Sequence, residues 1–414
     1  MIWNYKPNHQ FIEKSVAKEV ITNEKKDIID VLKPYRAVIH TDNTYKGTTS
    51  TSYIQSVLSY LENVNADDLT LIDNNLSVQQ INELMSVNNR LTMFWNANIP
   101  LQSFIEILKF ETVYLPEILF DRIIIDWNSI NKNRKLTVFL LNTTNRTLYQ
   151  TTIEHQVESR VLNTFVEPTK SFYIYTEIKR GNFLSLYTPV NSVESVKYMY
   201  LMNKDIPIDK FKKILFQNQE IIQQSETDSI KQYNDSMSKM TVDTKNRILN
   251  YVYTRSVGLA SIEPSRLLRE SFNFINEHGG YNADYRLSLI NIDKHIVEYQ
   301  MYYQGLPVFS AETATKISTT WGDEEIHKYR RPYYVLENDI PTEMKVKYLP
   351  SGLEIVEKYV HSDQDIKDLV LGYYLIQNLE LNVFELEPAW FTLKENSWER
   401  VKLENIGGIP NGLE

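Results

Sequence analysis

Glycine is almost absent from the first 258 residues of this chain, and that scarcity limits the folds it can adopt. Gly47, Gly181 and Gly258 are the only glycines there, and the other nine follow them. Folds that bind nucleotides need glycines where the backbone turns tightly against phosphate, as in G-x-G-x-x-G or G-x-x-x-x-G-K-[ST]. Neither motif occurs in this sequence. Rossmann and P-loop folds are therefore excluded.

The length and the net charge of the chain limit the number of domains and the kind of partner that we expect. A chain of 414 residues is longer than one hydrophobic core usually organises, so we expect two or three domains. Apolar residues make up 42% of the sequence, which predicts that most of it folds. The formal net charge of -9 argues against a nucleic-acid partner, because such binding depends on clustered Lys and Arg.

The chain contains no cysteine. Disulfides, thiolate catalysis, Cys-based zinc sites and iron–sulfur clusters are thereby excluded, and export from the cytosol is favoured. No run of about 18 apolar residues is long enough to span a membrane. Residues 1–7 nevertheless place Trp3, Tyr5 and Lys6 before a proline, as in a segment that follows a transmembrane helix. A frayed terminus is the alternative interpretation.

Patterns of apolar residues predict both strands and helices. β-Branched and aromatic runs indicate strands at residues 36–41, 122–127, 136–141, 172–178, 285–292 and 335–336. Helical spacing is found in two stretches, one with Ile54, Val57, Leu58 and Leu61, and one opened by Ser362 with Ile366, Leu369, Val370 and Tyr373. In the second stretch, Asp365 at the third position after Ser362 resembles a capping box.

A further helix is predicted over residues 261–278, with Pro264 in its first turn and Gly279-Gly280 as its stop. Several strand-like runs follow it, so we predict an α+β fold of mostly antiparallel sheets covered by helices. Two polar stretches interrupt the pattern. Residues 128–134 look like a hairpin loop, and residues 217–239 like an exposed segment, either a linker or a solvated helix.

A search for catalytic chemistry finds little. The seven histidines lack metal-binding spacing: His9, His40, His155, His278, His295, His327 and His361. The S-x-x-K matches at Ser15–Lys18 and Ser236–Lys239 lack the companion motifs of acyl-transfer sites. The densest acidic clusters, 323–325 and 363–365, are interpreted as a charged turn and a helix cap. We predict no catalytic residue, no metal site and no cofactor.

Tyrosine is abundant, with 27 residues, which suits protein interfaces but also sheet cores. Residues 321–334 combine acids, bases and aromatics, and two interpretations remain open for them. One is a patch that docks a partner, built from Trp321, Tyr329, Arg330, Arg331 and Tyr333. The other is a turn followed by an edge strand whose charges prevent aggregation.

Three stretches carry a resemblance to a known family. They are residues 321–334, residues 302–309 with the sequence YYQGLPVF, and Lys33-Pro34 leading into the strand at 35–41. Together they resemble the YycH family of Gram-positive regulatory proteins, over essentially the whole chain. The YYQGLPVF stretch is also similar to one in the related YycI family, whose soluble part resembles the last two YycH domains.

The resemblance implies a non-catalytic protein with one N-terminal transmembrane helix and three domains outside the cell. Its implied partners are a YycI-like protein and the WalK (YycG) sensor histidine kinase, which controls cell-wall metabolism; a homo- or hetero-oligomer is also expected. We place a membrane-proximal stalk at 1–15 and α+β domains at 16–164, 165–258 and 259–414. The alternatives are an extracellular ligand-binding module and a cell-wall hydrolase.

Overall fold

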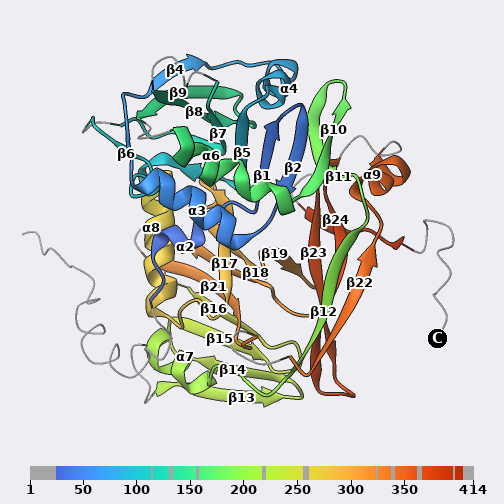
Figure 1. Ribbon diagram of the computed structural model, residues 1–414. Coiled ribbons are helices and arrows are strands. Elements are labelled where there is room, and N and C mark those ends of the chain that lie inside the picture. Colours follow the sequence, from blue (N-terminus) through green and yellow to red (C-terminus); the bar gives the residue numbers. More distant parts are fainter. Residues whose placement is uncertain are drawn as a thin grey trace, which may run out of the picture.

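The computed structural model describes residues 25–112, 115–128, 130, 134–154, 158–216, 221–254, 261–322, 325–336, 341–360, 366–394 and 397–403. The predicted membrane-proximal stalk therefore lies outside the described residues. The fold is α+β with two large, mostly antiparallel sheets, which confirms the predicted class (Figure 1). Among the described residues, no helix combines the length and apolar character needed to cross a bilayer.

The N-terminal sheet lies at the top of Figure 1 and has the order β11-β10-β2-β1-β5-β7-β8-β9-β3-β6, with β4 on β9. Its one parallel pair among the described strands is β3 with β6. The strands are β1 Arg36–Thr41, β2 Thr44–Thr48, β3 Asn65–Ala66, β4 Thr70–Asp73, β5 Arg90–Pro100, β6 Lys109–Phe110, β7 Leu119–Asp126, β8 Lys135–Asn142, β9 Thr147–Glu154, β10 Tyr173–Arg180 and β11 Phe183–Pro189.

The C-terminal sheet has the order β13-β14-β15-β16-β21-β20-β18-β19-β23-β24-β12-β22, with β17 on β18 and β25 on β24. Its strands are β12 Val193–Leu201, β13 Gln223–Thr227, β14 Ile230–Asn234, β15 Ser238–Asp243, β16 Ile248–Tyr253, β17 Asp284–Asn291, β18 Ile296–Tyr303, β19 Leu306–Phe309, β20 Lys316–Trp321, β21 Ile326–Pro332, β22 Glu343–Leu349, β23 Ile366–Asn378, β24 Val383–Lys394 and β25 Ser397–Arg400.

Amphipathic helices cover these sheets. The described helices are α2 Ile28–Val31, α3 Thr51–Glu62, α4 Val78–Ser86, α6 Glu158–Phe165, α7 Ile208–Leu215, α8 Pro264–Glu277 and α9 Gly352–Ile355, with short 3-10 turns at Leu101–Ser103 and Glu167–Ser171 and a π turn at Val356–Val360. Alternation along β1 explains the layers. Ala37 and Ile39 pack in the core that holds α3 and α6, whereas Val38 faces α4 on the other side.

The predicted helices at 54–61 and 261–278 are confirmed as α3 and α8. Pro264 occupies the first turn of α8, and the Gly280 amide donates to the Ile275 carbonyl at 2.8 Å beyond its end. Gly279 and Gly280 have φ of 106° and 66°, a conformation that side chains disfavour. The strands predicted from residue 36 to residue 292 are present, and strands β7 and β8, on either side of the predicted loop, pair antiparallel.

Three predictions were wrong. Residues 366–373 form part of strand β23, because a strand buried on both faces is apolar throughout and can imitate helical spacing. Its proposed cap, Ser362 with Asp363 and Asp365, lies outside the described residues. Residues 335–336 form no strand. Most of 221–239 belongs to strands β13 to β15 and not to a linker or a helix, and of these strands β13 is exposed along its whole length.

The predicted domain borders do not coincide with changes of sheet. Strand β10 falls in the predicted middle domain, yet it pairs with β2 of the N-terminal sheet. Strands β16 and β21 lie on opposite sides of the predicted border at 258/259 and pair with each other. The division into three domains stays a prediction.

The buried tyrosines predict a loss of stability at alkaline pH. Burial raises the pKa of Tyr251 to about 12, although its hydroxyl shares a 3.0 Å hydrogen bond with Ser238. A raised pKa in the folded state gives stability that is complete below about pH 10 and is lost as the pH rises through about 12. The free energy of unfolding, measured with urea, should therefore fall between these pH values by about 2 kcal/mol less for the Tyr251→Phe chain than for wild type. If the free energy of unfolding fell equally with pH for the two chains, the raised pKa of Tyr251 would be contradicted.

Candidate functional site

The five residues of the predicted docking patch do not form one surface. Strand β21 is paired on both sides, with β16 and with β20, so it is not the edge strand of the alternative interpretation either. Tyr329, Arg331 and Tyr333 are buried, and only Arg330 is exposed, with Trp321 half-buried. Three of the five side chains therefore cannot contact a partner in this conformation. Contact through Trp321 and Arg330 stays a prediction.

Arg331 instead binds backbone carbonyls at the C-terminal end of helix α8. Its guanidinium donates to the carbonyl of Gly280 at 2.9 Å, to that of His278 at 3.4 Å and to Asn282 Oδ1 at 3.0 Å. It also lies 5.3 Å from the centre of the Phe211 ring. A cation at a helix C-terminus satisfies carbonyls that have no partner within the helix. Arg331, one of the two adjacent bases in residues 321–334, therefore has a structural role.

No group of three or more His, Asp or Glu residues that could hold a metal ion occurs in the described part of the chain. His278 and His327 bind backbone carbonyls through Nδ1, at 2.8 Å and 2.9 Å. Ser236 and Lys239 lie exposed around the β14–β15 turn. His40 stacks on Tyr45 and His295 is buried. Several further sequence candidates lie outside the described residues, namely His9, His155, His361, Ser15, Lys18, Asp323 and Glu324.

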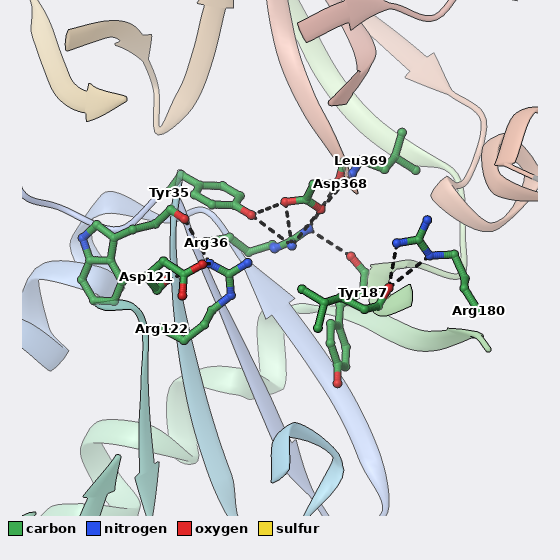
Figure 2. A network of polar contacts seen from close by, with 10 residues as sticks. Tyr35, Arg36, Asp121, Arg122, Arg180, Tyr187, Asp368 and Leu369 are labelled. Atoms are coloured by element: carbon green, nitrogen blue, oxygen red, sulfur yellow. Dashed lines mark hydrogen bonds and ion pairs between the residues drawn. The ribbon is translucent and has the colours of Figure 1, made fainter. Parts of the chain in front are cut away.

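A buried ion pair that sequence reasoning missed joins the two sheets (Figure 2). Arg36 begins β1, and its Nη2 lies 3.1 Å from Oδ1 of Asp368 on β23. The Tyr35 hydroxyl donates to the same carboxylate. Arg36 Nη1 donates to the carbonyl of Tyr187, at 3.1 Å, on β11. The register of β23 shifts between Ile366 and Asp368, and such a bulge redirects side chains.

The pKa shifts at this junction keep Arg36 charged and Tyr35 neutral. Burial alone would lower the pKa of Arg36, but Asp368 and the nearby tyrosines outweigh it, so the pKa is raised and the guanidinium stays charged. Burial raises the pKa of Tyr35, which keeps its hydroxyl neutral and able to donate. Arg36 also lies 4.7 Å from the centre of the Phe94 ring. No sequence signal pairs Arg36 with Asp368, because 332 positions separate them.

A cavity of about 370 Å³ opens beside this junction, between the two sheets. Its walls are mostly aromatic and aliphatic, with Tyr175, Tyr187 and Trp390 among them. Arg36 is the one charged side chain among the described residues that line it. A cavity of this size and character suits a small, largely apolar molecule.

An accessible apolar surface is found at the far edge of the C-terminal sheet. Strand β22 ends the strand order and pairs with β12 alone among the described strands. Met344, Val346 and Tyr348 alternate along it and are all exposed. The alternation is visible in the sequence, but only the pairing shows that the strand lies at an edge.

Two family models match the chain. The model of the YycH protein, N-terminal domain, matches residues 1–171, and that of the C-terminal domain matches residues 184–407. The chain belongs to the YycH family. This confirms the resemblance drawn from residues 33–41, 302–309 and 321–334. The YycH family is a regulatory family without catalytic activity, and the chain is not an enzyme.

YycH of Bacillus subtilis is similar to the chain along its length, both in sequence and in fold. The two-component system WalR/WalK regulatory protein YycH of Bacillus subtilis (strain 168) is 19% identical over 410 residues, covering 94% of this chain and 89% of the relative. The crystal structure of YycH from Bacillus subtilis matches with a TM-score of 0.77 at 16% identity. That match covers 92% of this chain and 99% of the solved one, which shows that the fold is shared.

Proposed function

We propose that this chain is an extracytoplasmic regulator that acts with a YycI-like protein to bind and modulate the WalK (YycG) sensor kinase. The observation that supports this most is the match of both YycH family models, which together extend over residues 1–171 and 184–407. The Bacillus subtilis relative is named as a regulatory protein of the WalR/WalK system. Control of cell-wall metabolism would follow through the kinase.

The proposal includes an N-terminal helix that holds the protein in the cell membrane, with these domains outside. The absence of cysteine and the Trp3, Tyr5 and Lys6 segment support it. A regulator shifts a two-state kinase only by binding its two states with different affinity. Contacts of the domain and of the anchor would both contribute, and anchoring in one membrane raises their effective concentration.

Buried charged side chains join the two sheets, which supports a structure in which binding of a partner at one sheet also affects the other sheet. Besides the Arg36–Asp368 pair, the buried Arg286 on β17 donates to the Pro34 carbonyl at 2.8 Å. A partner bound at one sheet would therefore act on a connected structure. Within the originally predicted patch, we retain Trp321 and Arg330 as candidate contacts.

The test is a membrane pull-down of the anchored protein, beside a version that carries an unrelated transmembrane helix. We expect both versions to recover the kinase and the YycI-like protein, with weaker recovery after the helix is exchanged. An additional Arg330→Glu version would test the exposed end of the patch, because charge reversal weakens a docking contact that uses this residue. Recovery of neither partner by either version would contradict the proposal.

A ligand-binding module is a second candidate, favoured by the cavity beside Arg36. Its lining combines aromatic walls with the hydroxyls of Thr48, Ser50 and Ser171. Failure of the pull-down would direct the search to this cavity.

A further inference from the structure

Strand β22 presents two different faces at an open edge. Met344, Val346 and Tyr348 are 65%, 49% and 72% exposed, and their alternate positions place them on one face. Exposed apolar residues on an unpaired edge favour the addition of another strand. The other face carries Glu343, Lys345 and Lys347.

The charges on that second face are incompletely paired. Lys347 lies 3.6 Å from Glu387, within a group that also joins Lys197 to Glu387 at 3.2 Å. Lys345 has no carboxylate within 4 Å among the described residues, and it lies directly opposite Lys197 in the ladder with β12. Glu343, likewise, has no described cation partner. Like charges placed opposite each other destabilise a sheet, and opposite charges stabilise it.

We propose that β22 is a self-association edge, where a second copy of this chain adds its own β22 in antiparallel orientation. The two-fold axis passes through the Met344 position. In that register each Glu343 lies opposite Lys345 of the second copy, so both unpaired charges find a partner of opposite sign. The two Met344 side chains meet on the other face.

Neighbouring registers place like charges opposite each other. An axis at Lys345 pairs Glu343 with Lys347 but also places the two Lys345 side chains opposite each other, and an axis at Val346 places Lys345 opposite Lys347. A shift by one residue would exchange the apolar and the charged faces. The charge pattern therefore selects the axis at Met344.

The interface is a single short strand pair, smaller than the usual area of a stable complex. Self-association is thus expected to be weak for the free chain and strong for copies that share one membrane, because anchoring raises their effective concentration. The stronger association in a membrane rests on the proposed anchor, whereas the strand pairing itself does not depend on the proposed kinase partner.

The absence of cysteine gives a direct test on the full chain. A Met344→Cys chain carries one thiol, and in the proposed register that thiol faces its counterpart at a distance suited to a disulfide. We expect mild oxidation with diamide to give a covalent dimer on non-reducing gels. The matched control is Tyr348→Cys on the same face, whose two thiols would lie roughly 26 Å apart and should stay unlinked. Both positions are exposed, so both chains should fold.

A charge exchange provides the second measurement. Lys345→Glu and Glu343→Lys should each abolish the Met344→Cys cross-link, and a mixture of the two chains should restore it, because each then supplies the charge the other needs. Three results would overturn the proposal. They are no cross-link at Met344, faster cross-linking from Val346→Cys than from Met344→Cys, or no restoration in the mixture. If the dimer is absent while Lys345→Glu lowers kinase recovery, the occupant of this edge is a partner protein.

Discussion

An Asp368→Ala chain should unfold with a free energy about 3–5 kcal/mol lower than wild type. The substitution leaves Arg36 charged and buried, with neutral acceptors in place of its carboxylate, namely the carbonyls of Tyr187 and Leu369. It also removes the acceptor of the Tyr35 hydroxyl. Equilibrium urea unfolding followed by tryptophan fluorescence measures the loss, since each sheet holds a buried tryptophan, Trp95 on β5 and Trp390 on β24.

Two further variants make this test specific. Glu167→Ala removes an exposed ion pair with Lys170 and should change stability by less than about 0.5 kcal/mol. Arg36→Met combined with Asp368→Leu removes both charges, and it should recover much of the loss, because the uncompensated charge is what costs most. If Asp368→Ala resembled Glu167→Ala, the ion pair would not couple the two sheets.

The second large effect is expected at Arg331, where Met should destabilise the chain by about 3–5 kcal/mol. Methionine keeps the apolar length of the side chain but leaves the carbonyl of Gly280 and Asn282 Oδ1 without their buried donor. The same unfolding measurement applies. We also expect Arg331→Lys to restore only part of the loss, since one ammonium cannot reproduce the planar fork of donors.

The neighbouring residue supplies the matched control. Arg330→Met on the exposed side of the same strand should change stability by less than about 0.5 kcal/mol. Comparing the stability and the kinase recovery of Arg330→Met and Arg331→Met distinguishes a role in folding from a role in docking. If Arg331→Met were as stable as wild type yet lost the kinase, Arg331 would be a docking residue after all.

Local chemistry allowed much of the fold to be predicted. Helix α8 is marked at both ends by Pro264 and by Gly279-Gly280, because the first turn tolerates a residue without an amide proton and the stop needs positive φ. Strand β1 was predicted with its observed bounds from its β-branched run. The family was also predictable, since short stretches such as 302–309 resemble it in the sequence itself.

The errors share one cause, which is that burial and pairing depend on distant parts of the chain. Ile366, Leu369 and Tyr373 fit a helix as well as a strand buried on both faces, and only the twelve-residue ladder with β24 decides between them. Arg330 and Arg331 look alike in the sequence, yet successive side chains of β21 point to opposite faces of the sheet, so one is exposed and the other is buried.

The sequence by itself determined the fold class, the family, the main helices and the exclusion of nucleotide and thiol chemistry, because each of these depends on which residues occur and on their local order. Only the tertiary structure decided which charges are buried, which strand forms the open edge and where the cavity lies. Arg36 and Asp368 become an ion pair across 332 positions only when both sheets are packed together. Contacts of that range are set by the whole core, since no local preference of either residue encodes its partner.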